Sequence, residues 1–105
     1  MIKVGIRLKD GNITGLKMSG HANSAPYGQD LVCAAASAIA IGGLNALDEM
    51  YPQLEIPCQA ADNRISVDAC ACYAEVQPVL QTIYYQLRTL EDQFPKSISI
   101  LKKEV

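Results

Sequence analysis

The sequence has little charge and no strong excess of either sign, which limits the partners that suit it. Charged residues make up 19% of the 105 residues, and the formal net charge is −2. Proteins that bind nucleic acid usually present a basic surface, and the longest basic run here is Lys102-Lys103. We therefore expect no nucleic-acid partner.

Long apolar runs are also scarce. We expect no segment to be apolar for long enough to span a bilayer. Apolar and polar residues alternate at the N-terminus instead of forming the apolar core of a signal peptide. We expect no membrane partner and a cytoplasmic location. Half of the residues are hydrophobic, which is enough for one buried core, and a chain of this length has no room for a second. Residues 1–105 are therefore predicted to form a single domain.

Ligands for a metal are few, because the sequence has one histidine and four cysteines. Cys70 and Cys72 are spaced as C-x-C, whereas structural zinc sites normally use C-x₂₋₄-C and four ligands. Cys58 and His21 would complete a set of four, but nothing in the sequence brings them together. We predict no metal site and no cofactor.

Disulfides are not expected either, because a chain without an export signal usually keeps its thiols reduced. If Asp62-Asn63 form a two-residue turn, Cys58 faces Val67 on the neighbouring strand. Cys70 then lies three residues further along, about 10 Å away, which is too far for a disulfide with Cys58. Cys58, Cys70 and Cys72 are therefore interpreted as structural thiols.

Hydrophobic periodicity predicts five strands and two helices. In order, the expected elements are strands over 2–8 and 13–19, a helix over 31–51, strands over 54–60 and 64–71, a helix from about 75 to 94, and a strand over 97–100. The order β-β-α-β-β-α-β is typical of a two-layer α+β fold in which two helices cover a mostly antiparallel sheet.

Several local features accompany this pattern. Gly15 is a plausible bulge that brings Ile13 into phase with the rest of its strand. The first helix is so apolar that we expect it to be buried on most sides, with a neighbouring backbone packed closely on Gly42-Gly43. In the second helix Pro78 fits only within the first turn, and an apolar stripe runs as far as Phe94.

The residues suited to chemistry gather in one stretch, 20–34. His21, the only histidine, follows Gly20 at the end of a predicted strand. Asp30 suits a helix N-cap, which would place Cys33 in the first turn, where the helix dipole favours the nucleophilic thiolate. A cysteine and a histidine on either side of a polar loop form a candidate catalytic pair, with Cys33 as nucleophile and His21 as general base. Backbone N–H groups of Cys33 and its first-turn neighbours are candidate oxyanion donors.

Simpler interpretations of these residues remain open. Cys33 also fits a small buried hydrophobe in an alanine-rich helix. A carboxylate near the thiol opposes the thiolate, so Asp30 is either only a cap or also an orienting group for His21, and we favour the cap. Ser37 shares the helix face of Cys33; its hydroxyl either bonds back to the Cys33 carbonyl or supports the site.

A motif in two parts carries a family resemblance: Gly20-His21-Ala22, and Tyr27-Gly28-Gln29-Asp30-Leu31-Val32-Cys33-Ala34 followed by Ser37. It resembles the motif of the ribosomal-processing cysteine protease family, and the order of elements extends the resemblance over essentially the whole chain. The resemblance implies an endopeptidase of the bacterial cytosol that cuts after an aromatic residue. Its substrate would be the short N-terminal extension of the large-subunit ribosomal protein numbered twenty-seven.

The resemblance also implies roles for individual residues. Cys33 and His21 would be catalytic, Gly20, Asp30 and Ser37 would support them, and the substrate-binding loop would include Ala22, Tyr27, Gly28 and Gln29. It further implies a homodimer that needs no metal or cofactor.

Two other classes of function stay in competition with the protease. One is a redox sensor in which Cys33 is oxidised and Cys58, Cys70 or Cys72 resolves it. The other is a non-enzymatic ribosome-assembly module that uses the loop as a peptide clamp and tolerates Cys33→Ala.

Overall fold

The computed structural model describes residues 1–20, 30–61 and 64–105. Its elements are β1 (Ile2–Lys9), β2 (Asn12–Ser19), α1 (Leu31–Met50), a short 3₁₀ turn η1 (Pro52–Leu54), β3 (Cys58–Ala61), β4 (Arg64–Asp68), α2 (Tyr73–Gln93) and β5 (Ile98–Glu104). The predicted order and the α+β class are confirmed. The expected turn at Asp62-Asn63 lies outside the described residues.

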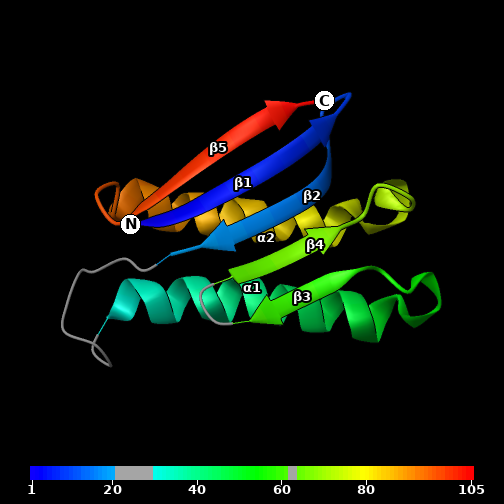
Figure 1. Ribbon diagram of the computed structural model, residues 1–105, viewed down its shortest axis with the longest axis horizontal. Helices are drawn as coiled ribbons and strands as arrows, with labels where there is room; N and C mark the ends of the chain where they lie inside the picture. The colour runs from blue at the N-terminus through cyan, green and yellow to red at the C-terminus, as the bar shows by residue number, and fades with distance from the viewer. Residues whose placement is uncertain (21–29, 62–63) are drawn as a thin grey trace.

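The five strands form one sheet in the order β3-β4-β2-β1-β5. Three of its pairings are antiparallel, and β1 pairs with β5 in parallel. Both helices lie on the same side of the sheet, where α2 packs against β2 and β5 and α1 packs against β4 and α2 (Figure 1). The other face of the sheet carries no layer formed by the described residues.

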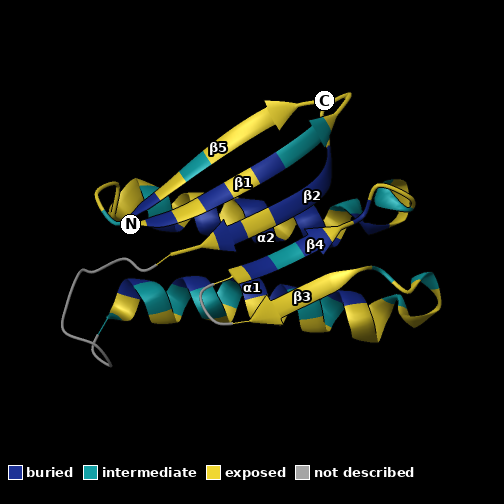
Figure 2. Ribbon diagram, in the orientation of Figure 1, coloured by how far each residue is buried: buried dark blue, intermediate teal, exposed yellow. Residues whose placement is uncertain are grey.

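The core lies between the sheet and the helices. On β1, buried Ile2, Val4 and Ile6 alternate with exposed positions, so one face of the strand points to the helices and the other to solvent. On α2, Leu80 and Leu87 are fully buried, and each such side chain contributes roughly 1.5–3 kcal/mol by leaving water. Figure 2 shows the same contrast between the buried central strands and the exposed edge strand β3.

The sequence predicts a β-bulge at Gly15, but the structure has it one residue earlier, at Thr14. Arg7 pairs with Gly15 and Leu8 pairs with Ile13, so Thr14 is the extra residue. Its hydroxyl and carbonyl oxygens accept hydrogen bonds from the Arg7 guanidinium, at 3.2 Å from Nε and 3.1 Å from Nη2. Gly15 lies beneath that guanidinium, and a Cβ there would displace it.

Helix α1 is less buried than expected. Its buried residues form one narrow stripe: Val32, Ala36, Ala40, Gly43 and Leu47. Leu31, Ile41 and Met50 are 79%, 44% and 59% exposed, because the helix packs on the sheet and on α2 and no other described segment covers its outer side. The prediction that it is buried on most sides was wrong.

The apolar character of α1 also changes the expectation that no segment could span a membrane. Among the described residues, this helix of 20 residues with a hydropathy of 1.6 is long and apolar enough to cross a bilayer by composition alone. The core helix of a globular protein can have the same length and composition, and α1 packs against α2 and β4. The expectation that no segment is apolar for long enough was nevertheless wrong.

The glycine pair of α1 has two different environments. A Cβ on Gly43 would collide with the Ile83 side chain of α2, whereas a Cβ on Gly42 would meet nothing within 4 Å. Close approach therefore applies to Gly43 alone, and the neighbour is a side chain instead of the predicted backbone.

Helix α2 begins at Tyr73, two residues before the predicted start near Glu75. Pro78 therefore lies in the second turn, where its missing N–H costs one helical hydrogen bond. The apolar stripe is buried as predicted up to Leu90, but Phe94 is the C-cap and 42% exposed.

Candidate active site

The first turn of α1 is fixed by a side-chain cap. Asp30 has extended backbone angles, φ −82° and ψ 98°, and its carboxylate accepts a hydrogen bond from the Cys33 backbone N–H at 3.0 Å. The carbonyl of Asp30 accepts from the N–H of Ala34 at 3.1 Å, which closes the first helical turn. The N-cap that the sequence predicts is therefore present, and Cys33 is the third residue of the helix.

Cys33 is half-buried and packs at the margin of the core. This position lies between the two alternatives from the sequence, since the residue is neither fully exposed nor enclosed like a core alanine. Its backbone N–H is engaged by Asp30. An oxyanion formed at this turn would therefore need a donor other than the Cys33 N–H, which narrows the predicted donor set.

The other predicted site residues fall into two groups. His21, Ala22, Tyr27, Gly28 and Gln29 lie outside the described residues. Ser37 is half-buried one turn after Cys33.

Gly20 ends the segment before the loop and has a backbone reason to be glycine. Its φ is +94°, and a Cβ there would lie 2.5 Å from the carbonyl oxygen of Met1. A positive φ is strained for other residues. The chain therefore leaves β2 through a conformation that glycine alone adopts easily.

The remaining cysteines lie at the other end of the sheet. Cys58 begins β3 and pairs with Val67 as predicted, and Cys70 and Cys72 follow the end of β4. Figure 1 shows these strand ends opposite to the N-terminus of α1. None of the three forms a disulfide. A resolving cysteine must reach the oxidised thiol, so this separation disfavours the redox-sensor alternative.

The electrostatics of these thiols argue the same way. Partial desolvation of the thiol, followed by the charge of Asp48, raises the pKa of Cys58. Burial, followed by the charges of Glu75 and Asp68, raises the pKa of Cys72. A resolving cysteine attacks as thiolate, so both are poorly suited to that role.

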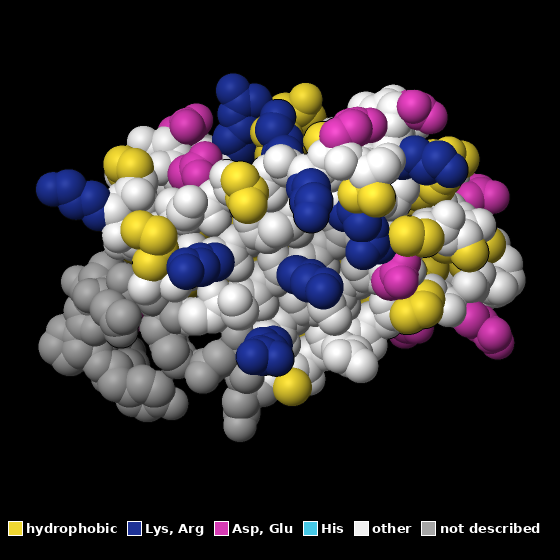
Figure 3. All heavy atoms as spheres, turned by 45° about the horizontal axis from the view of Figure 1, so that its top comes forward, with side chains coloured by type: hydrophobic (Ala, Val, Ile, Leu, Met, Phe, Trp, Pro, Cys, Tyr) yellow, Lys and Arg dark blue, Asp and Glu magenta, His cyan; other side chains and the backbone are white. Residues whose placement is uncertain are grey.

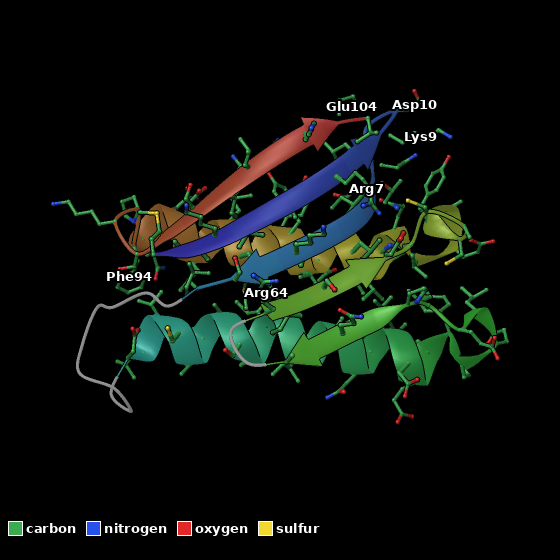
Figure 4. All side chains as sticks on the ribbon, viewed as in Figure 1. Arg7, Lys9, Asp10, Arg64, Phe94 and Glu104 are labelled. Atoms are coloured by element: carbon green, nitrogen blue, oxygen red, sulfur yellow. The ribbon has the colours of Figure 1, made fainter. Side chains whose placement is uncertain are left out.

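Cys70 belongs to a polar cluster around Arg7, which Figure 4 places near the end of the sheet that also carries Asp10 and Glu104. Arg7 Nη2 lies 3.0 Å from both Asp68 Oδ1 and Cys70 Sγ. Cys58 and Cys70 are exposed and Cys72 is half-buried, so two of the three cysteines that were interpreted as structural thiols lie at the surface.

No group of three or more metal-ligating side chains forms within residues 1–20, 30–61 and 64–105. The described residues therefore supply no cluster that would hold a metal ion.

A family model for cysteine protease Prp matches residues 1–99. The chain belongs to the cysteine protease Prp family. It is 36% identical over 105 residues to the ribosomal processing cysteine protease Prp of Staphylococcus aureus strain Mu50, covering 95% of this chain and 97% of that protein. It is 48% identical over 48 residues to the protein of that name from Bacillus subtilis, covering 45% of this chain and 43% of the relative.

Solved Prp structures agree in fold. Prp from S. aureus with a covalently linked product peptide matches at a TM-score of 0.85 and 30% identity, covering 98% of this chain and all of that one (100%). The same protease with a substrate peptide matches at a TM-score of 0.80 and 31% identity, with the same coverage. The chain is thus a cysteine protease of ribosomal processing. The predicted enzyme class is confirmed, and the non-enzymatic clamp was wrong.

Proposed function

We propose that this Prp protein removes the short N-terminal extension of large-subunit ribosomal protein twenty-seven, with Cys33 as nucleophile and His21 as general base. The observation that carries the proposal is the Asp30 cap, which holds Cys33 in the first turn of α1. Cys33 ends the motif that resembles that of the family, and the motif lies within the residues that the family model matches. His21 is the only histidine in the sequence, so a histidine base has one candidate.

The reaction would proceed in two steps. His21 takes the thiol proton as the Cys33 sulfur attacks the scissile carbonyl, and it returns that proton to the leaving amine as the thioester forms. Water then attacks the thioester with His21 again as base, which releases the carboxyl product and restores the thiol. The negative oxygen formed in each step would be bound by donors other than the Cys33 N–H.

The supporting residues have separate roles in this proposal. Ala22, Tyr27, Gly28 and Gln29 contact the substrate peptide, and Gly20 directs the chain from β2 into that loop. Ser37 supports the first turn from the same face of α1. The peptides bound to the S. aureus relative support a peptide as the partner.

We further propose that residues 1–105 act as one domain in a cytoplasmic homodimer. The support is the outer side of α1, where Ile41 and Met50 are exposed. A groove of 590 Å³ between α1 and α2, lined mostly by apolar residues, includes Met50 in its lining. A second copy would cover this surface and remove its apolar area from water.

The test is cleavage of the extended ribosomal protein by wild type, Cys33→Ala and His21→Ala, read by mass spectrometry, with Cys70→Ala as the control for a distant thiol. We expect a discrete N-terminal peptide from wild type and Cys70→Ala, and intact substrate with the other two variants while circular dichroism shows them folded. Cleavage by Cys33→Ala would overturn the mechanism. Light scattering on the same wild-type sample should give twice the mass of one chain. A measured mass equal to that of one chain would contradict the proposed homodimer.

A further inference from the structure

The outer face of the sheet is strongly basic. Strand register places six of the nine Lys and Arg residues on the face that the helices do not cover: Lys3, Arg7, Lys9, Lys17, Arg64 and Lys103. We call this set the basic face. The one acidic residue that the register of the described strands places among them is Asp68. Figure 3 shows lysine and arginine side chains spread over the sheet side of the molecule.

The positions of these cations follow from the pairing. Lys3 and Arg64 both pair with Ser19, from opposite sides, so they lie two strand spacings apart, or about 10 Å. Lys17 lies two residues before Ser19 on β2 and on the same face of the sheet. Lys103 on β5 pairs directly with Arg7 on β1. The charges therefore spread over four adjacent strands instead of forming one contact point.

Most of this charge is not neutralised locally. Arg7 forms an ion pair with Asp68 at 3.0 Å. Within the part of the chain that the structure describes, the remaining members of the basic face have no ion-pair partner. Acidic residues gather in the helical layer instead: Asp48, Glu49, Glu75, Glu91 and Asp92. The net charge of −2 is thus an average over two unlike sides. It therefore does not exclude nucleic acid as a partner for the basic face.

We propose that the basic face binds the sugar-phosphate backbone of structured RNA. Dispersed Lys and Arg side chains on an open sheet suit repeated phosphates, which dominate affinity for nucleic acid. The described residues of this face include no aromatic side chain, so it offers no platform for stacking bases. Small residues such as Gly5, Ser66 and Ser99 lie between the cations and keep the surface flat. These features favour helical RNA over a single strand, and processing of ribosomal proteins takes place where such RNA is abundant.

The test measures binding of a fluorescein-labelled RNA hairpin to the full chain by fluorescence anisotropy at 50 and 200 mM salt. About four phosphate contacts would weaken binding roughly a hundredfold over that range. The variant Lys3→Ala/Lys17→Ala should bind roughly tenfold more weakly and lower the salt slope by about two. The matched control is Arg88→Ala/Lys96→Ala, which removes the same charge from exposed positions outside the sheet and should bind like wild type.

Three outcomes would overturn the proposal. The first is no RNA binding at 50 mM salt, and the second is an equal loss of RNA affinity in the control variant. The third is displacement of the RNA by poly-glutamate as effectively as by unlabelled hairpin, which would indicate an acidic protein partner instead. Cys33→Ala should leave RNA binding unchanged, so this result is independent of the proposed mechanism. Circular dichroism of both double variants confirms that any loss is not unfolding.

Discussion

The carboxylate of Asp30 accepts a 3.0 Å hydrogen bond from the backbone N–H of Cys33, so one interaction joins the helix cap to the proposed nucleophile. The same bond satisfies a first-turn donor and fixes the direction in which the helix presents Cys33. It also places a carboxylate close to a site that is proposed to use a thiolate. The effect of Asp30 on stability and cleavage therefore has two parts, the hydrogen bond that caps the helix and the negative charge of the carboxylate.

Substitution of Asp30 makes that separation. Asp30→Ala removes the cap and should lower the free energy of unfolding by about 1 kcal/mol. Asp30→Asn keeps an accepting oxygen without the charge, so we expect both stability and cleavage close to wild type. Urea unfolding and the mass-spectrometric cleavage assay measure the two quantities. A stable Asp30→Asn variant with cleavage reduced tenfold or more would show instead that the charge orients His21.

Gly20 should be intolerant of any side chain. Gly20→Ala forces a Cβ against the Met1 carbonyl at a φ of +94°, and such backbone strain costs on the order of 1–3 kcal/mol. Thermal unfolding should show the loss. The control is Gly5→Ala, where a Cβ meets nothing within 4 Å; it should be neutral or slightly stabilising. Equal effects at the two positions would contradict the backbone argument.

The two helix glycines should respond in opposite directions. Gly42→Ala has open space and should raise the free energy of unfolding by up to about 1 kcal/mol. Gly43→Ala meets the Ile83 side chain and should lower it by roughly 1–3 kcal/mol, as overpacking does. Ile83→Val removes Cδ1, the nearer of the two colliding Ile83 atoms, so the double variant should recover part of that loss. Additive effects of Gly43→Ala and Ile83→Val in chemical unfolding would disprove the contact.

Asp68 gives a pH dependence with a defined sign. Hydrogen bonds from the backbone N–H and side chain of Cys70, followed by the charge of Arg7, lower the pKa of Asp68. Its stabilising contribution is therefore present above the unfolded pKa of about 4 and is lost as pH falls through the lower folded value. The side chain is 59% exposed, so solvent screening keeps this contribution below about 1 kcal/mol.

The variant Asp68→Asn measures that contribution. It should be less stable than wild type in urea at pH 6, and the difference should shrink below pH 4. A difference that is constant between pH 6 and pH 3 would assign the effect to packing instead of charge.

Features set by neighbouring residues were predictable from the sequence. The Asp30 cap and the pairing of Cys58 with Val67 follow from side-chain chemistry and strand geometry over a few residues. The exposure of Ile41 depends on which sides of α1 receive a partner, and apolar composition alone does not contain that information. The bulge position was missed because Thr14 is held by Arg7 across the hairpin, a contact that is invisible to periodicity.

The charge of the chain shows the same limit. Net charge averages over the whole surface, whereas the basic face depends on strand order, which brings Arg64 and Lys3 to either side of β2. The alternation of Lys3 and Arg7 on the first strand was visible in the sequence. That it continues onto neighbouring strands became clear only once the register was known.

The parallel pairing of β1 with β5 has a consequence for how the protein folds. Ile2 pairs with Ile98, so one edge of β1 stays open until the last strand arrives, while β2 pairs early through a short turn. Joining segments so distant in sequence costs loop-closure entropy and slows folding. Until then the unpaired edge of β1 is available to other strands. Aggregation during synthesis or refolding is therefore most probable at the first strand, and agents that speed docking of β5 should improve recovery of active protease.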